Sequence, residues 1–442
     1  MDRLTGFFTE LMRKYLPDPF VFAIILTLLT LVMAIIFGNN PIDMNYAWGQ
    51  GFWSLLAFGM QMTVILAAGA VLATTPIVER GLDWLVTKVH SPRMAIIVAT
   101  LVGGIGSYLN WGFGLIIGGI IAKKLALNVK GVHHPLIIAS AYSGFTLYGL
   151  GLSATIPITI SAAGHPLEDR MGIIPLAETI FSPWMLGCAL AILITLPLIN
   201  ASMHPKDPAK IVEINRELHA PAEVPTKVVT EDMTIGTRLN NSKILGITMA
   251  LFGLLYAVVY FTRDGKMDIN IINLIILFIG MLVLQTPAAY VKKLQQNISL
   301  VSGIVLQFPF YAGIMALLDA SGLVEAISNA FVAISTPATL GFWGLISSFL
   351  INFFAPSAGG HWVIQGPFMA DAAVQLNSSM AQMAMSVQLG NAWNDLVQPF
   401  WILPALALSK LKLKDIMGYT VVSMLAMGVI YIAATLAWGF FS

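Results

Sequence analysis

Charged residues are scarce in this chain of 442 residues: Lys, Arg, Asp and Glu make up 10% of it, against 57% for hydrophobic residues. A soluble domain carries about 25% charged residues, so most of this chain must be surrounded by lipid rather than water. The formal net charge of +1 gives no strong field for nucleic acid, which we do not expect as a partner. The single cysteine, Cys188, excludes an intrachain disulfide and a cysteine-based metal cluster.

Soluble catalytic motifs are missing as well. The sequence contains no Gly-x-Ser-x-Gly, no phosphate-binding loop and no His-Glu-x-x-His. A cleavable signal peptide is not expected either, because residues 4–16 form an apolar helical face typical of an interfacial helix. We therefore expect a membrane protein that is not an enzyme and has no organic cofactor.

Uncharged runs long enough to cross a bilayer are frequent. About 20 residues at 1.5 Å each span a hydrocarbon core of about 30 Å. Such runs lie near 20–37, 52–74, 136–160, 179–199, 244–262, 270–290, 298–318, 382–409 and 416–440.

Two further apolar stretches, 94–122 and 338–370, are interrupted near the middle. The first is dense in glycine around Asn110, and the second contains Pro356 followed by Gly359 and Gly360. Glycine and proline break helices, so each stretch is predicted to be a re-entrant hairpin with two half-length arms.

The positions of Lys and Arg predict how the chain is threaded. Basic residues cluster before and after 94–122, in the segment 200–243 and after 409, whereas none occurs from 294 to 409. With the basic segments in the cytoplasm, the first hairpin opens inward and the second outward. The N-terminus is then cytoplasmic and the C-terminus external, in a multi-pass protein of the bacterial inner membrane.

This arrangement predicts an inverted repeat. The N-terminal half, 1–199, and the C-terminal half, 244–442, each contain a short amphipathic segment before a hairpin, then a broken span, 136–160 or 382–409. The polar segment 200–243 is the cytoplasmic linker. The predicted fold class is an all-α polytopic membrane protein, an inverted-repeat transporter with two re-entrant hairpins and two interrupted helices.

The hairpin tips and the helix breaks are the candidate sites. Irregular backbone at membrane depth must line a cavity or be buried in protein; helix N-termini suit an anion, and freed carbonyls with Ser, Thr or Asn side chains suit Na⁺. No Lys or Arg lies in these regions, so an anionic substrate depends on N–H groups, neutral side chains and a bound cation. The tip candidates for substrate are Asn110, Trp111, Gly112, Phe113, Ser357, Gly359, Gly360, His361 and Trp362. The break candidates for the coupling ion, within 143–151 and 390–395, are Ser143, Thr146, Gly149, Asn391, Asn394 and Asp395.

Two of these residues, His361 and Asp395, are ionisable and lie in segments predicted to be inside the membrane. An ionisable residue in that position is expected to take part in binding or transport. His361 could donate a hydrogen bond to a carboxylate or carry a proton, and its alternative is a structural contact with the hairpin backbone. Asp395 could ligate a cation or accept a proton, or bond to local N–H groups. Trp111, Trp362 and Trp393 lie at tips or breaks and are candidates for the wall of an acyl-chain pocket.

Several of these blocks resemble the short-chain fatty acid transporter family, whose bacterial members include acetoacetate and butyrate uptake proteins. The resemblance covers almost the whole chain, and the Ser-Asn-Thr signature of distantly related sodium-coupled dicarboxylate carriers is not intact. The blocks are Leu16-Pro-Asp-Pro-Phe20, Trp53-Ser-Leu-Leu-Ala-Phe-Gly-Met60, Asn110-Trp-Gly-Phe-Gly-Leu115, Gln307-Phe-Pro-Phe-Tyr-Ala-Gly313, Gly359-Gly-His-Trp-Val-Ile-Gln-Gly-Pro367 and Gln398-Pro-Phe-Trp401.

The resemblance implies a monocarboxylate substrate. The distant relation to the sodium-coupled dicarboxylate carriers of the ion transporter superfamily implies a scaffold with a mobile transport domain, an elevator motion and a homodimer. The leading hypothesis is a secondary transporter of short-chain fatty acid anions coupled to Na⁺ or H⁺. The alternatives are a di- or tricarboxylate–cation symporter, an ion channel, and a membrane-embedded enzyme for which His361 and Asp395 are the candidate acid–base pair.

Overall fold

The computed structural model describes residues 19–216, 234–263, 265–353, 355–398, 401–402, 405–406 and 409–441, and every regular element within these ranges is helical. The predicted interfacial helix at 4–16 and the centre of the linker at 217–233 lie outside the described residues.

The part before the linker begins with three helices that lead to a short amphipathic helix, α5, and then to a helical hairpin, α6–α7. A broken helix follows the hairpin, and a long helix closes the series. The elements are α2 (Pro19–Ile36), α3 (Pro41–Gly51), α4 (Leu56–Ala73), α5 (Pro76–Val86), α6 (Pro92–Leu109), α7 (Trp111–Asn128), α8 (His134–Ser143), η1 (Gly144–Leu150), α9 (Thr155–Ile160), α10 (Glu168–Met171) and α11 (Pro183–Ser202).

The part after the linker adds α12 (Ile235–Asn240) and α13 (Lys243–Thr262) and then goes through a similar succession. An amphipathic helix, α17, again precedes a hairpin, α18–α19. The elements are α14 (Ile269–Leu284), α15 (Pro287–Asn297), η4 (Ile298–Val301), α16 (Ser302–Ser321), α17 (Leu323–Ile334), α18 (Leu340–Ile351), α19 (Ala358–Gln375), α20 (Met380–Asp395) and α22 (Leu413–Phe441).

Local sequence signals set where many helices begin. Proline occupies the first turn of α5, α6, α8, α11 and α15, where its missing N–H needs no partner. Side chains of Ser91, Ser182, Ser242 and Ser379 accept hydrogen bonds from first-turn N–H groups of α6, α11, α13 and α20. The helix starts are therefore encoded locally, although the helices are apolar throughout.

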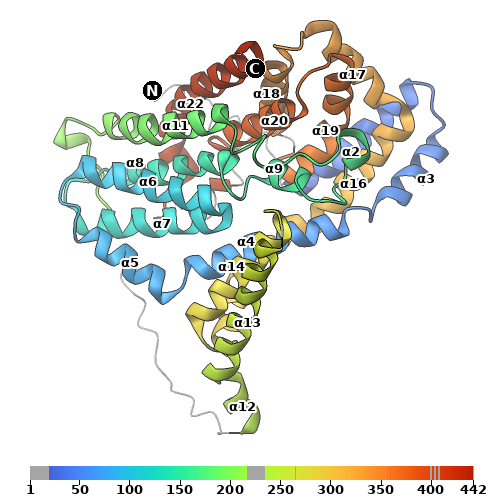
Figure 1. Ribbon diagram of the computed structural model, residues 1–442. Helices are drawn as coiled ribbons and strands as arrows, with labels where there is room; N and C mark the ends of the chain where they lie inside the picture. The colour runs from blue at the N-terminus through green and yellow to red at the C-terminus, as the bar shows by residue number, and fades with distance from the viewer. Residues whose placement is uncertain are drawn as a thin grey trace.

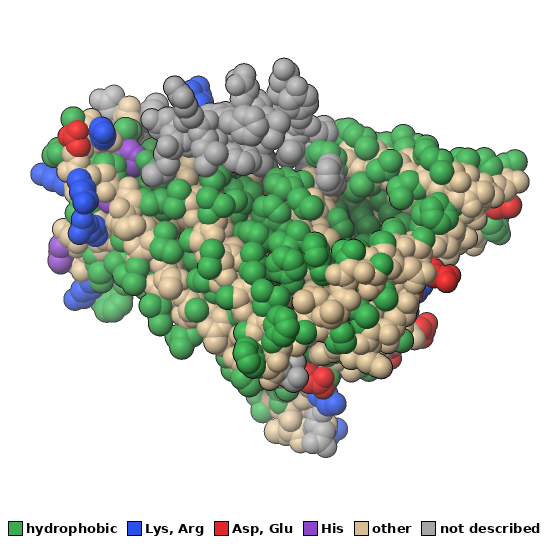
Figure 2. All heavy atoms as spheres, turned by 90° about the horizontal axis from the view of Figure 1, so that it is seen from above, with side chains coloured by type: hydrophobic (Ala, Val, Ile, Leu, Met, Phe, Trp, Pro, Cys, Tyr) green, Lys and Arg blue, Asp and Glu red, His purple; other side chains and the backbone are tan. Residues whose placement is uncertain are grey.

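Eight helical segments among the described residues are long and apolar enough to cross a membrane. The surface agrees with this, because the face in Figure 2 is dominated by hydrophobic side chains and its charged side chains lie near the edges. The prediction of an all-helical polytopic membrane protein is confirmed.

Two details of the prediction are wrong. The arms of the first hairpin are not half-length, because α6 and α7 have 18 residues each, about 27 Å at 1.5 Å per residue. The second break also lies later than predicted at 390–395, since α20 is regular through Asp395 and the chain leaves the helix at 396–398. Gly390 does not break α20, because it provides close packing: a Cβ there would lie 2.3 Å from the Leu345 carbonyl oxygen of α18.

The helices pack in two groups. One contains both hairpins with α8, α9, α11, α20 and α22, and the other contains α2, α3, α4, α13, α14, α15 and α16. Figure 1 shows α4 between the hairpin α6–α7 and α14, with α2 and α3 on the far side of α16. The groups meet where α4 packs on α7 and α16 packs on α19, and this junction contains the candidate site.

Candidate functional site

A small buried pocket lies where the two hairpin tips meet. Its empty volume is about 330 Å³, including its opening. Trp111 comes from the first tip and Ser357 from the second, while Thr155 stands at the start of α9. The complete lining is Met62, Trp111, Phe145, Tyr148, Thr155, Ile304, Ser357, Ala358, Gly359 and Trp401, without a formally charged side chain.

The first tip is a single-residue turn made by Asn110. This residue is extended, with φ −156° and ψ 126°, and both ends α6 and begins α7. Its Oδ1 accepts a hydrogen bond from the Phe113 N–H at 2.8 Å, so the side chain caps α7 and does not line the pocket. A Cβ on Gly69 of α4 would lie 2.1 Å from that Oδ1, which explains glycine there. The backbone N–H of Trp111 donates to Ser153 Oγ at 2.8 Å.

The second tip leaves its helix N-terminus open. The Ser357 carbonyl accepts from the His361 N–H at 2.7 Å, and the Ser357 side chain makes no capping hydrogen bond. The N–H groups of Ala358, Gly359 and Gly360 precede that first bond and have no intrahelical acceptor. An open hydroxyl and an electropositive helix terminus therefore border the pocket.

Aromatic rings form one wall of the pocket. The rings of Trp111 and Trp401 are 5.5 Å apart, Phe145 lies 5.9 Å from Trp401, and Phe145 stacks on Tyr148 at 4.7 Å. The indole N–H of Trp111 has no acceptor among the described residues. This wall combines an apolar surface with one available donor.

A polar cluster lies behind the pocket, between η1 and α20. Asp395 accepts hydrogen bonds from Tyr148 Oη at 2.7 Å and from Asn352 Nδ2 at 2.8 Å. Asn352 also donates to Asn394 Oδ1 at 3.2 Å, and Asn391 bonds to both Tyr148 and Asn352. Because Tyr148 also lines the pocket, this cluster of oxygen atoms is joined directly to it.

The six coupling-ion candidates divide between two places. Asn391, Asn394 and Asp395 meet in the cluster just described. Thr146 and Gly149 of η1 face the same stretch of α20: the Thr146 hydroxyl donates to the Ala392 carbonyl at 3.1 Å, and a Cβ on Gly149 would lie 2.6 Å from Ala392 Cβ.

Ser143 belongs to a different network. Its hydroxyl accepts a hydrogen bond from Asn200 Nδ2 at 2.8 Å, and Asn200 also bonds to Thr100 and Ser423. These contacts join α6, α8, α11 and α22, which indicates a packing role for Ser143.

The remaining tip candidates pack against neighbouring helices. A Cβ on Gly112 would lie 3.0 Å from the Leu66 carbonyl oxygen, and one on Gly360 would lie 2.2 Å from the ring of Tyr311. His361 bonds to the side chain of Gln365, which donates to Ser347 Oγ of α18 at 2.8 Å, so these side chains link α19 to α18. Trp362 is fully buried and is not among the pocket residues.

Among the described residues, His361 and Asp395 have no hydrogen-bond partner in common. The arrangement therefore does not support their assignment as an acid–base pair.

Sequence reasoning missed most of the residues that line this pocket. Trp401 and Phe145 supply most of the aromatic wall, whereas Trp393 packs on Phe349 and donates to the Met424 carbonyl at 2.8 Å. Tyr148 lies within the predicted break at 143–151, and Asn352 lies within the predicted hairpin at 338–370. Each is a polar side chain in an apolar segment, and this pattern could have marked both as site residues.

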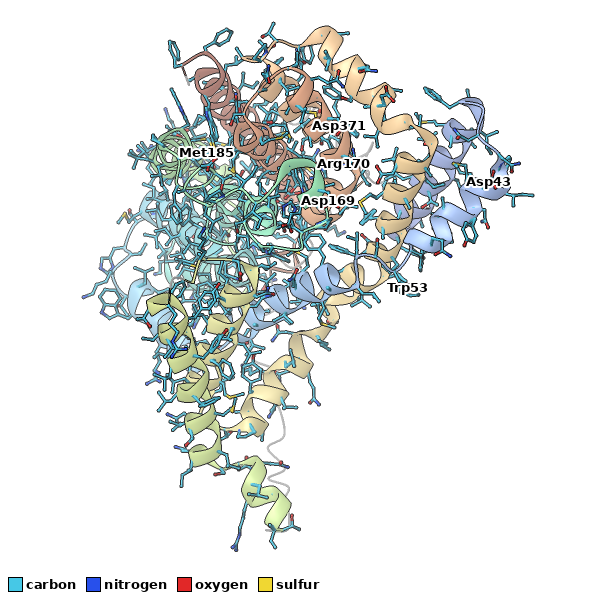
Figure 3. The ribbon with its side chains drawn as sticks, turned by 45° about the vertical axis from the view of Figure 1, so that its right-hand side comes forward. Asp43, Trp53, Asp169, Arg170, Met185 and Asp371 are labelled. Atoms are coloured by element: carbon cyan, nitrogen blue, oxygen red, sulfur yellow. The ribbon has the colours of Figure 1, made fainter. Side chains whose placement is uncertain are left out.

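An ion-pair cluster joins the two helix groups at the end near α10. Arg170 bonds to both oxygens of Asp371 in α19, at 3.0 and 2.9 Å, and to Asp319 of α16 at 2.7 Å. Figure 3 shows Arg170 next to Asp371. Asp371 is therefore part of a contact between the groups.

Together, the spanning helices, the paired hairpins and the uncharged pocket at their tips define a polytopic membrane transporter. The chain matches the model of the short-chain fatty acid transporter family over residues 1–437 and belongs to that family. A relative from Escherichia coli strain K12 is 38% identical over 434 residues, and one from Haemophilus influenzae is 36% identical over 441 residues. Each alignment covers 98% of both chains, and both relatives carry the provisional name short-chain fatty acid transporter.

A solved structure shares the fold. The YdaH transporter of Alcanivorax borkumensis, whose topology is described as unusual, matches with a TM-score of 0.60 and 14% identity, covering 96% of this chain and 98% of that one. At this identity the likeness concerns the fold alone, and it agrees with the predicted fold class.

Proposed function

We propose that the pocket at the hairpin tips binds the carboxylate of a short-chain fatty acid anion. The observation that carries this proposal is the open N-terminus of α19, where the Ser357 hydroxyl and the first N–H groups border a pocket without a charged side chain. Helix N-termini bind anions through free N–H groups and the helix dipole. Thr155 at the N-terminus of α9 and the indole of Trp111 are further donors at the same pocket.

The acyl chain of this anion would lie against the apolar residues Met62, Phe145, Ile304 and Trp401. The pocket between the two tips is narrow, which favours a short chain. Burial of each methylene there contributes about 0.8 kcal/mol, so a chain of three or four carbons adds appreciable affinity.

A di- or tricarboxylate is the alternative substrate. A second buried carboxylate needs a compensating cation or hydrogen bonds, and the residues that line the pocket include no Lys or Arg. Competition of succinate and citrate with labelled butyrate distinguishes the two readings, and we expect neither to compete.

The cluster around Asp395 is proposed as the coupling-ion site. Its carboxylate and the amide oxygens of Asn391 and Asn394 are donors suited to Na⁺, and the carboxylate alone is suited to a proton. The contact through Tyr148 joins this site to the substrate pocket. Either Na⁺ or H⁺ symport fits this arrangement.

The two helix groups suggest how the substrate crosses. The hairpin group would move as the transport domain against the group of α4 and α16, which would act as the scaffold of an inverted-repeat elevator. We further propose a homodimer in the bacterial inner membrane, with the N-terminus in the cytoplasm and the C-terminus outside.

Uptake into proteoliposomes tests the substrate proposal. Labelled C2–C6 acids are offered under an imposed Na⁺ or H⁺ gradient, each alone. Ser357→Ala removes one hydrogen bond to a charged group, worth about 1.5–3 kcal/mol, so the KM for butyrate should rise about 10- to 100-fold. Ser357→Thr should restore much of the affinity. Ser202→Ala, at the exposed end of α11, is the matched control.

An unchanged KM in Ser357→Ala would contradict the site, and transport indifferent to both gradients and to the membrane potential would contradict coupling. Recovery of chemically altered substrate would instead favour a membrane-embedded enzyme.

A further inference from the structure

A second, larger cavity lies between the two helix groups. Its volume is about 700 Å³, including the space that opens to the outside, and the exposed loop residues Ala163 and Gly164 stand along it. Gln61 of α4, Thr159 of α9 and Met315 of α16 supply other parts of the lining. Both groups of helices therefore contribute to its walls.

This cavity continues the line of the substrate pocket. Phe58 lines the large cavity and Met62, one turn further along α4, lines the pocket. Thr159 and Thr155 have the same relation on α9. Four residues of helix advance about 6 Å, so the two spaces are adjacent levels of one path between α4 and α9.

The ring of Phe58 lies between these levels, because Phe58 lines the cavity and adjoins Gly359 of the pocket, and Phe308 packs beside it. Phe58 of α4 and Phe308 of α16 lie 5.5 Å apart between centroids, at 48°, and are only 5% and 3% exposed. Both rings contact the backbone of Gly359, where a Cβ would lie 3.0 Å from Phe58 Cζ and 3.1 Å from Phe308 Cζ. The ring pair thus rests directly on the open N-terminus of α19.

We propose that the large cavity is the access vestibule of the substrate pocket and that Phe58, with Phe308, is the gate between them. This inference rests on the proposed function of the pocket. The short carboxylate anion would collect in the vestibule and pass when the Phe58 ring leaves Gly359. Phe58 and Phe308 come from the scaffold group and Gly359 from the hairpin group, so movement of one group against the other would also open the gate.

Cysteine accessibility tests the gate without any transport measurement. The native chain has one cysteine, so Cys188→Ala with Ser357→Cys places a single thiol in the pocket. The purified protein in lipid nanodiscs is treated with an anionic methanethiosulfonate reagent. Phe58→Ala should raise the labelling rate of this thiol at least tenfold, and Phe58→Leu should raise it less.

Three controls make the outcome specific. Ala163→Cys, in the exposed loop at the vestibule, should react at the same fast rate whether or not Phe58 is present. Phe252→Ala, on an exposed side of α13, should leave Ser357→Cys labelling unchanged. Native Cys188 is 3% exposed and would react only if the protein unfolded. It should therefore stay unreactive in Phe58→Ala, which shows that this variant is folded.

A labelling rate within twofold of the parent in both Phe58→Ala and Phe58→Leu would overturn the gate. Butyrate should also protect Ser357→Cys from the reagent when it is supplied well above the KM that loss of the Ser357 hydroxyl is expected to raise. Fast labelling of Phe58→Ala without butyrate protection would leave the gate intact and remove the proposed substrate, so the two failures are distinguishable.

Discussion

Asp395→Asn is the substitution that tests the coupling-ion proposal most directly. Asp395 is buried, and no Lys or Arg among the described residues forms an ion pair with it. Its hydrogen bonds from Tyr148 and Asn352 contribute about 1.5–3 kcal/mol each to a charged acceptor, about 3–6 kcal/mol together. The desolvation of a buried ion opposes this by several kcal/mol. Because the two nearly cancel, a bound cation or proton decides the state of the carboxylate.

Thermal unfolding in matched NaCl and choline chloride measures cation binding. A ligand at 100 times its Kd stabilises the native state by about 2.7 kcal/mol. With Na⁺ as coupling ion, the Tm of the native protein rises with Na⁺ and that of Asp395→Asn does not. With H⁺, neither protein responds to Na⁺. In both cases, gradient-driven butyrate accumulation should fall at least tenfold in Asp395→Asn, while substrate counterflow persists.

Asp43→Asn is the control, because Asp43 lies exposed on α3, which packs with α2 and α16 in the other helix group. If Asp395→Asn keeps gradient-driven accumulation within twofold of the native protein, the assignment of Asp395 to coupling is refuted. Loss of counterflow as well would indicate damage to the substrate pocket instead.

Two further predictions concern stability. Gly103→Ala should lower the Tm in detergent, since its Cβ would lie 2.3 Å from the Ala141 carbonyl oxygen and such overpacking costs about 1–3 kcal/mol; Gly187→Ala, with no atom within 4 Å, should leave the Tm equal or higher. His133, before α8, accepts from the Val212 N–H at 3.0 Å, and burial together with nearby His204 lowers its pKa to about 4. The unfolded chain binds the proton more readily, so stability should fall from pH 6.5 to pH 4, and Tm measurements should show a smaller fall in His133→Gln.

The sequence was sufficient for the hairpins because their signals are local. Asn110 terminates α6 and caps α7 by itself, and the first break coincides with η1 at Gly144–Leu150. The second break was misplaced because glycine has two uses in membrane helices. Gly390 is in a regular helix and allows α18 to approach. This use of glycine depends on a partner helix, and the neighbouring residues in the sequence do not reveal it.

The composition of the site was harder to predict for a similar reason. His361 was chosen as an ionisable group beside a glycine pair, but its position on α19 directs it to Gln365. Trp401 reaches Trp111 from a segment far along the chain. Which side of a helix faces the pocket is decided by packing between helices, so residue type alone could name the tips but not the side chains that line them.

Within the described part of the chain, no Lys or Arg lines the pocket at the hairpin tips. This is consistent with a site that binds an anion and releases it again, as transport requires. With Asp395 ionised, the empty site carries one negative charge. A cation and a monocarboxylate bound together would leave that net charge unchanged, so the proposed movement of the loaded hairpin group would carry no additional electrostatic cost. A dicarboxylate with a single cation would add a further negative charge in a setting where buried charge is expensive. The charge balance between Asp395 and the open N-terminus of α19 would thus favour the proposed monocarboxylate over a dicarboxylate independently of pocket size, and it would make the proposed coupling ion a condition of movement.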